Sequence, residues 1–164
     1  MHVNNELTAR EFIRKVFIEE TERLIQDGSF HFAFVIMAQG IETLGGFLDT
    51  KPLKAKDQSK LRFSHAINRL MPKQYSELNN NHALYDKFRA SLAHTFTVSR
   101  QIILTSKNNP VNGKRHLQQT NEKLIFVAED FYEDFKKACK RLLEAMDKGM
   151  VTEKKMNERY YYTF

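Results

Sequence analysis

The most constraining feature of the sequence is a helix that is apolar on all sides. Between Phe30 and Ala38 nearly every residue is apolar, and the helical pattern extends over residues 29–48. A helix that is hydrophobic all round is normally covered by other elements, so this segment predicts the central helix of a bundle. Gly40 permits another backbone to approach it closely. The apolar run is shorter than the roughly 20 residues needed to span a bilayer, so we expect no membrane association.

Further helices are predicted around this central one. Apolar residues that recur at helical spacing predict helices over residues 8–26, 58–70, 82–96 and 129–146. In the helix over 82–96, the residues that share the predicted core face are Leu84, Tyr85, Phe88, Leu92 and Phe96. The sequence therefore predicts an all-α fold, a four- to five-helix bundle.

The helical pattern is interrupted before the last long helix. Residues that favour strands occur at 100–105, 116–119 and 123–127, and turn-forming residues occupy 108–113. We expect a small antiparallel β-hairpin inserted at this point. Residues 1–149 are predicted to form one domain, and residues 150–164, which include Tyr160, Tyr161 and Tyr162, form a C-terminal tail.

Composition excludes several classes of protein and site. The chain has 164 residues and one cysteine, Cys139, which cannot form an internal disulfide bond. We predict that this cysteine fills space in the core. No basic region followed by an apolar stretch marks the N-terminus, and we place the protein in the cytoplasm. The histidines lack metal-ligand spacing and no phosphate-binding loop is present, so no metal or other cofactor is expected.

The excess positive charge is concentrated in one segment. The formal net charge is +6, and seven basic residues face one acid, Asp57, between Lys51 and Lys73. Such a patch attracts phosphate groups, and the candidate binding residues are Lys51, Lys54, Lys56, Lys60, Arg62 and Arg69. A solvated, lysine-rich loop and helix face explains the segment equally well, because no series of aromatic residues for base stacking accompanies it.

One predicted helix carries a cation and an imidazole close together in sequence. At about 100° per residue, Arg89 and His94 are separated by about 140° around the helix, with Ala90 and Ala93 between them. Small residues let a second helix approach, and two-fold symmetry would bring Arg89 of one copy toward His94 of another. The alternative is that Arg89 pairs locally with Asp86 or with an acid of the central helix, and that His94 only caps or packs.

The residues around this pair resemble the HEPN superfamily, small all-helical domains marked by an arginine and, four to six residues later, a histidine. The residues that carry the resemblance are Leu84, Tyr85, Phe88, Arg89, Leu92, Ala93 and His94, after a helix that contains Ile41 and Glu42. It covers about residues 29–146 and implies metal-independent RNA cleavage, with Arg89 and His94 as catalytic residues. It also implies a homodimer that forms the active cleft. Family members are often toxins or phage-defence components and often have a nucleotidyltransferase antitoxin as partner.

Three residues are candidates for supporting this pair, and one residue departs from the family pattern. If Glu42 is buried it requires a cationic partner; otherwise it lies at the solvent edge of its helix. Asp86 and Ser91 are positioned to orient the pair. Ala90 stands directly after Arg89, where active family members usually carry a polar residue. The alternative functions are therefore a catalytically inactive HEPN-like dimer that binds RNA or protein, and a helical structural protein in which the spacing is accidental.

Overall fold

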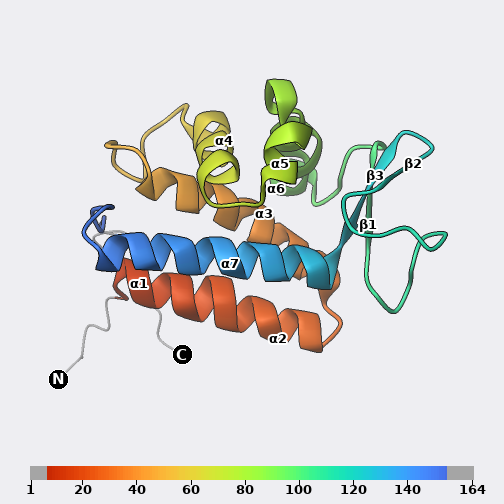
Figure 1. The fold of residues 1–164 in the computed structure, drawn as a ribbon, viewed down its shortest axis with the longest axis horizontal. Helices are drawn as coiled ribbons and strands as arrows, with labels where there is room; N and C mark the ends of the chain where they lie inside the picture. Colours follow the sequence, from red (N-terminus) through yellow and green to blue (C-terminus); the bar gives the residue numbers. More distant parts are fainter. Residues whose placement is uncertain (1–6, 155–164) are drawn as a thin grey trace.

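The apolar segment forms α3, Phe30–Phe47, which runs through the middle of the fold (Figure 1). The computed structural model describes residues 7–154. Among the helices described, α3 alone is long and apolar enough to cross a membrane by length and composition, and 56% of it is buried inside the protein. Gly45 lets α4, Ser59–Arg69, approach, because a Cβ atom there would lie 1.8 Å from the carbonyl oxygen of Arg62.

One side of α3 is covered by the first and last helices, which lie side by side (Figure 1). The first is a continuous rod composed of α1 (Ala9–Phe12), the π-helix η1 (Ile13–Glu20) and α2 (Thr21–Gln26). It begins with a capping box, in which Thr8 and Glu11 satisfy each other's backbone N–H groups. The last is α7, Ala128–Asp147. Both helices are confirmed, although the sequence did not predict the π-helical turn.

The other side of α3 carries α4 and a series of short helical segments (Figure 1). These segments are α5 (Lys73–Leu78), η2 (Asn80–His82), the π-helix η3 (Tyr85–Ala90) and α6 (Ser91–Thr95). The prediction of one regular helix over 82–96 is therefore too simple. Phe96 has a left-handed conformation with φ 55° and is 57% exposed, so its prediction as a core residue is wrong. The reason is that the backbone turns at this residue and directs the ring outward.

A three-stranded mixed sheet lies at one end of the molecule, with the strand order β1-β3-β2. Its strands are β1 (Ile102–Thr105), β2 (Gln119–Thr120) and β3 (Lys123–Val127). Only β2 and β3 form an antiparallel hairpin, through Asn121 and Glu122, which both have positive φ. The prediction of a purely antiparallel hairpin is wrong, because β1 pairs with β3 in parallel. The central strand β3 is buried from Leu124 onward, pairs with β1 on one side and β2 on the other, and leads directly into α7.

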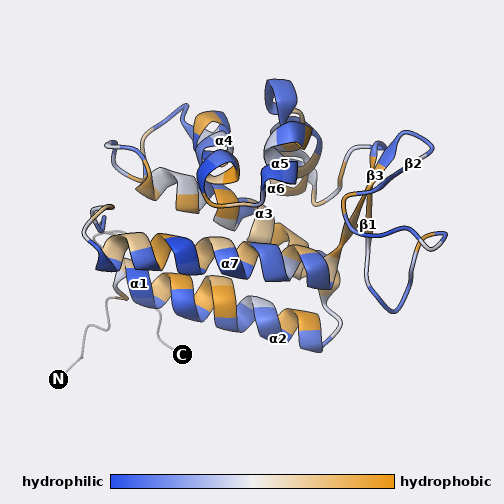
Figure 2. Ribbon diagram, in the orientation of Figure 1, coloured by the Kyte–Doolittle hydropathy of each residue, from blue (hydrophilic) through white to orange (hydrophobic). Residues whose placement is uncertain are grey.

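Aromatic side chains join the sheet to the helices. Phe88 of η3 stacks on Phe126 of β3 with ring centroids 4.7 Å apart, and Phe131 of α7 packs edge-on against both. The apolar faces of the helices point toward this interior, and polar residues cover the outside (Figure 2). The segment that carries Arg89 and the β insertion thus share one core, which fixes their relative positions.

Candidate functional site

Arg89 reaches from η3 to the surface of α3. Its Nη2 atom donates a hydrogen bond to Oε1 of Gln39 at 2.9 Å and lies 2.5 Å from Oε2 of Glu42. The guanidinium also lies over the ring of Tyr85, 5.4 Å from the ring centroid. The side chains of Arg89 and Glu42 are only 12% and 18% exposed. Two helices and an aromatic ring therefore fix the position of this guanidinium.

The Arg89–Glu42 contact is an ion pair with incomplete hydrogen bonding. Oε2 of Glu42 and Nε of Arg89 are both buried, and neither has a hydrogen bond of good geometry within the described part of the chain. A buried donor without a partner is costly and is commonly retained where a ligand or a motion uses it. Glu42 is therefore partly buried with a cationic partner, which was one of the two alternatives for this residue. For Arg89 the same contact is the local pairing with an acid of the central helix, the alternative to a catalytic role.

His94 is exposed and lies beyond Arg89 on α6. Across residues 7–154, no hydrogen bond or ion pair connects His94 to Arg89 or to another side chain. Arg89 is directed toward α3, whereas His94 faces solvent, with the half-buried Ala90 and Ala93 between them. One copy of the chain thus presents the two candidate catalytic side chains on different sides of the helix.

The two other supporting residues are occupied elsewhere. Asp86 forms an ion pair with Lys60 of α4 at 3.0 Å. The hydroxyl of Ser91 donates to the backbone carbonyl of Asp86 at 3.2 Å, a bond within the helix. Neither residue contacts Arg89 or His94 through a hydrogen bond, so the prediction that they orient the pair is wrong for the isolated chain. Asp86 pairs instead with a lysine of α4, and Ser91 forms its hydrogen bond within its own helix.

The predicted basic segment divides into structural and exposed residues. Arg62 is buried and binds Asp49, so its prediction as a binding residue is wrong. Lys51 donates to Gln58 at 2.8 Å, and Lys60 binds Asp86 and lies over the ring of Tyr85. Four exposed cations of the segment have no ion-pair partner among the described residues: Lys51, Lys54, Lys56 and Arg69. Only Lys60 contacts the helix that carries Arg89.

A hydrogen-bonded network that the sequence did not predict links α5, the β insertion and α7. The backbone N–H of Val127 donates to Nδ1 of His116 at 3.0 Å, so the proton of the neutral ring is on Nε2. Nε2 then donates to the hydroxyl of Tyr75 at 2.7 Å, and this hydroxyl donates to Asp134 at 3.0 Å. Burial lowers the pKa of His116 to about 4 and raises the pKa of Tyr75 and of Asp134.

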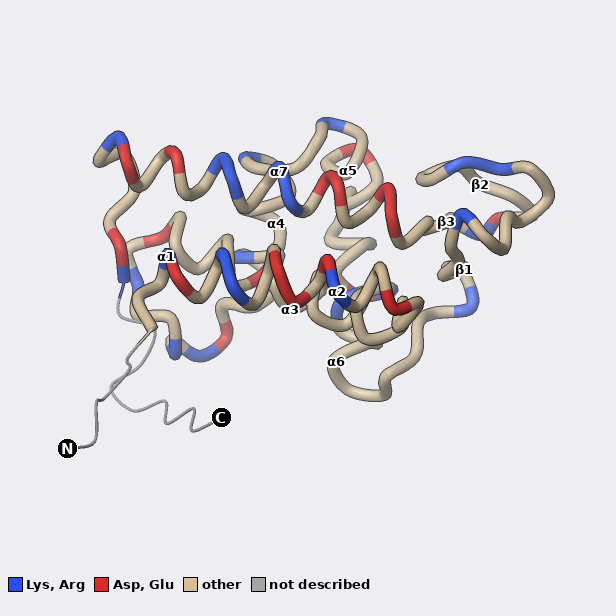
Figure 3. The backbone as a smooth tube through the Cα atoms, turned by 90° about the horizontal axis from the view of Figure 1, so that it is seen from below, with Lys and Arg blue, Asp and Glu red and all other residues tan. Residues whose placement is uncertain are grey.

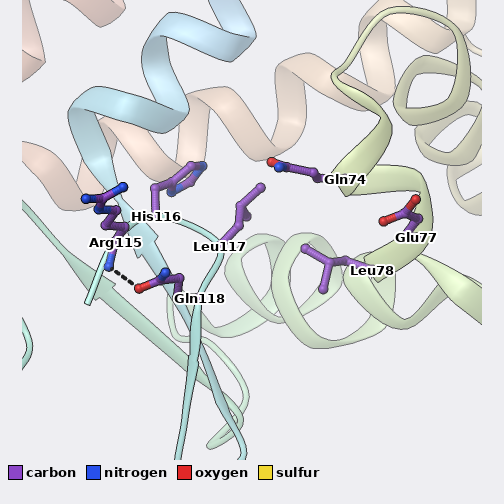
Figure 4. Close-up of a pocket in the computed structure, with 7 residues that line it drawn as sticks. All are labelled: Gln74, Glu77, Leu78, Arg115, His116, Leu117 and Gln118. Atoms are coloured by element: carbon purple, nitrogen blue, oxygen red, sulfur yellow. Dashed lines mark hydrogen bonds between the residues drawn. The ribbon is translucent and has the colours of Figure 1, made fainter.

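A hollow of about 460 Å³ opens beside this network (Figure 4). It is lined by Gln74, Glu77, Leu78, Arg115, His116, Leu117 and Gln118. Both ring nitrogens of His116 already take part in hydrogen bonds, so the imidazole has no free nitrogen for a ligand. The network therefore holds the β insertion in place. The sequence carried no signal for it, because the three side chains come from distant segments.

The remaining candidates for chemistry are inert. Cys139 is buried, and burial raises the pKa of its thiol, which keeps it protonated and unreactive. Within residues 7–154, no three histidine, cysteine or acidic side chains gather as metal ligands. The tyrosine-rich tail lies outside the described residues.

Comparisons of the chain with protein-family models, with curated proteins and with solved structures found no match. The function of the protein is therefore inferred from the residues and geometry of this chain.

Proposed function

We propose that the protein is a HEPN-like, metal-independent endoribonuclease whose active site is formed across a homodimer. The observation that carries the proposal is the position of Arg89. Its guanidinium is held by Gln39 and Glu42 at the surface of α3, and the same helical segment presents His94 to solvent five residues later. The surrounding residues follow the pattern of the family.

These two side chains supply the groups that cleavage of RNA through its own 2′-hydroxyl requires. An imidazole near neutral pH takes the proton from the 2′-OH and delivers a proton to the leaving 5′-oxygen. The 2′-oxygen forms a bond to phosphorus, the bond from phosphorus to the 5′-oxygen breaks, and a 2′,3′-cyclic phosphate remains. Arg89 donates hydrogen bonds to the phosphate oxygens as negative charge builds on them. Its contacts with Gln39 and Glu42 both use Nη2, which leaves Nη1 for the substrate.

The homodimer follows from the divergent directions of the two side chains. Within one chain Arg89 is directed toward α3 and His94 faces solvent. Ala90 and Ala93 between them allow a second helix to approach closely. A two-fold axis through this strip places Arg89 of one copy opposite His94 of the other, twice in each dimer.

The second candidate function is a dimeric RNA- or protein-binding module without catalysis. Ala90 favours it, because it replaces the polar residue that usually follows the arginine. The engagement of Asp86 with Lys60 also favours it, because this carboxylate is then not available to orient His94. A role as a cytoplasmic toxin or defence component, with a nucleotidyltransferase antitoxin as partner, rests on the family resemblance alone.

The test is cleavage of labelled RNA in EDTA by the wild type, Arg89→Ala and His94→Ala. We expect cyclic-phosphate ends from the wild type and a loss of at least about 100-fold in each variant, the usual scale for removal of an acid–base group. His65→Ala, which removes an exposed histidine of α4, is the matched control and retains full activity. Absence of cleavage by the wild type on several RNAs would favour the binding module.

Mixing the two inactive variants tests the shared site directly. A dimer that contains one Arg89→Ala copy and one His94→Ala copy has one intact site. Random exchange of subunits therefore restores about a quarter of the wild-type activity. If each copy carried its own complete site, the mixture would stay inactive.

A further inference from the structure

Backbone hydrogen bonds bring three basic residues into neighbouring segments where η3 meets the sheet. The backbone N–H of Ser99 donates to the carbonyl of Lys87 at 3.0 Å, which brings the next residue, Arg100, beside the first turns of the helix. The N–H of Leu124 donates to the carbonyl of Gln101 at 2.8 Å, which brings Lys123 to the same place. We call Lys87, Arg100 and Lys123 the sheet-end cluster.

The sheet-end cluster carries uncompensated charge. Arg100 and Lys123 are exposed and Lys87 is half-buried, and none has an ion-pair partner among residues 7–154. Of the neighbouring acids, Asp86 is held by Lys60, and Glu122 is exposed beside Lys123 without an ion pair within the same residues. By contrast, Lys107 of the same insertion is paired with Asp130. Figure 3 shows further basic positions around the sheet.

The cluster leads toward the proposed catalytic residues. Lys87 of η3 precedes His94 of α6 by seven residues in the same helical segment, which places the two residues about 10 Å apart along its axis. Phe96 follows His94 and is 57% exposed, because the backbone turns outward at this residue. Basic side chains that follow a strand and an aromatic ring that stacks on a base are the features by which proteins bind single-stranded nucleic acid.

We propose that the sheet-end cluster binds the phosphates of single-stranded RNA and that Phe96 stacks on a base, so that the strand passes His94. This inference rests on the proposed function and names where its substrate binds. It replaces the basic segment at residues 51–73 as the principal RNA contact, since Arg62 there is buried in an ion pair and Lys60 is bound to Asp86. The β insertion would then be the substrate-binding arm of the helical domain.

The experiment measures binding of a fluorescently labelled single-stranded RNA by anisotropy in EDTA, with His94→Ala present throughout to prevent cleavage. The triple variant Lys87→Ala, Arg100→Ala, Lys123→Ala should weaken binding by at least about tenfold near 0.1 M salt. The slope of log affinity against log salt should decrease by about 2, since each phosphate contact to a single strand contributes about 0.7. Phe96→Ala should weaken binding by about tenfold, the scale of one base–aromatic stack.

Two triple variants with the same change in charge are the controls. Arg14→Ala, Lys15→Ala, Lys140→Ala removes exposed cations of η1 and α7, on the other side of α3, and should leave the affinity within about twofold. Lys54→Ala, Lys56→Ala, Arg69→Ala removes three exposed, unpaired cations of the rival segment at residues 51–73. The proposal is overturned if this rival variant, and not the sheet-end variant, loses the affinity and the salt slope. It is also overturned if the wild type binds anionic lipid vesicles and not RNA.

The outcomes separate this proposal from the proposed function. Tight binding that depends on the cluster, without cleavage by wild-type protein, would support the RNA-binding surface and leave the protein a binding module. Cleavage that depends on His94, with binding insensitive to the cluster, would support the ribonuclease and overturn the surface. Circular dichroism of each variant verifies that it is folded.

Discussion

Two arginines each extend from a helix to an acid of α3 or the loop after it, and their surroundings differ. Arg62 donates from Nε to Asp49 at 2.7 Å, from Nη1 to the carbonyl of Leu53 at 2.6 Å and from Nη2 to the carbonyl of Pro52 at 2.8 Å. Arg89 has only Gln39 and Glu42, and its buried Nε has no partner among the described residues. The guanidinium of Arg62 therefore has hydrogen-bond partners for all three nitrogens, whereas Nε of Arg89 has none among the described residues.

The difference indicates what each pair is for. Arg62 ties the loop after α3 to α4, and Lys154 also binds Asp49. Burial by itself would raise the pKa of Asp49, but the hydrogen bonds from Arg62 and Lys154 outweigh it and hold the pKa at about 2. Such a pair is a structural clamp. The pair of Arg89 and Glu42 leaves the buried Nε of Arg89 without a partner among the described residues, a feature also found in groups that bind a ligand.

The largest expected effect on stability comes from a substitution at Gly45, where α3 and α4 pack closely beside the Arg62–Asp49 pair. Gly45→Ala would place a Cβ atom 1.8 Å from the carbonyl oxygen of Arg62, so α3 and α4 must separate. We expect the free energy of unfolding to fall by more than about 3 kcal/mol, as for severe overpacking of a core. Urea denaturation followed by circular dichroism measures it. Gly113→Ala, with open space around its Cβ, is the control and should cost only about 1 kcal/mol for its positive φ.

The next largest effect is the loss of stability when each of the two arginines is replaced by alanine. Arg62→Ala should lower the free energy of unfolding by about 3 kcal/mol, because it removes a buried cation that donates to the half-buried Asp49 and to the carbonyls of Leu53 and Pro52. Arg89→Ala should cost less, about 2 kcal/mol, since it removes one hydrogen bond to Gln39 and the ion pair with Glu42, and no backbone carbonyl loses a donor. Arg69→Ala, an exposed position on α4, should change stability by less than about 0.5 kcal/mol. Equal losses for Arg62→Ala and Arg89→Ala would contradict the distinction between the two pairs.

His116 differs from both arginines because its side chain is buried in the neutral form. Burial lowers the pKa of His116 from 6.5 to about 4, so below pH 6.5 protons bind preferentially to the unfolded chain. Stability is therefore lost as the pH falls from about 6.5 to about 4, by up to about 3 kcal/mol. Urea denaturation between pH 7 and pH 4 measures this loss.

The variant His116→Gln isolates that titration. An amide side chain can accept from Val127 and donate to Tyr75, but it does not titrate. We expect a smaller decrease in stability between pH 6.5 and 4 in this variant. The raised pKa of Asp134 acts in the opposite direction, because it makes the folded chain bind a proton more readily, so it offsets part of the remaining loss. An unchanged pH profile would mean that His116 is not the group responsible.

Local patterns predicted the helices well because each helix is defined by its own periodicity. The central helix α3, the rod from Ala9 to Gln26 and the last helix α7 were all found within one or two residues. The pairing of β1 was not predictable in this way, since parallel pairing depends on the path of the chain between residues 106 and 118. The short helix α5 was also missed, because six residues are too few for a periodic signal.

The amino-acid pattern alone is enough to predict the central apolar helix, the helical class of the fold and the proximity of Arg89 and His94 on one segment. Which charged side chains are available for binding depends on the tertiary structure. Arg62 and Lys54 are both cations of the same basic segment, yet Arg62 is buried against Asp49 and Lys54 is exposed. Likewise His116 becomes a buried neutral link to Tyr75. The physical reason is that burial and hydrogen-bond partners, which set the charge and reactivity of a polar group, come from segments distant in sequence.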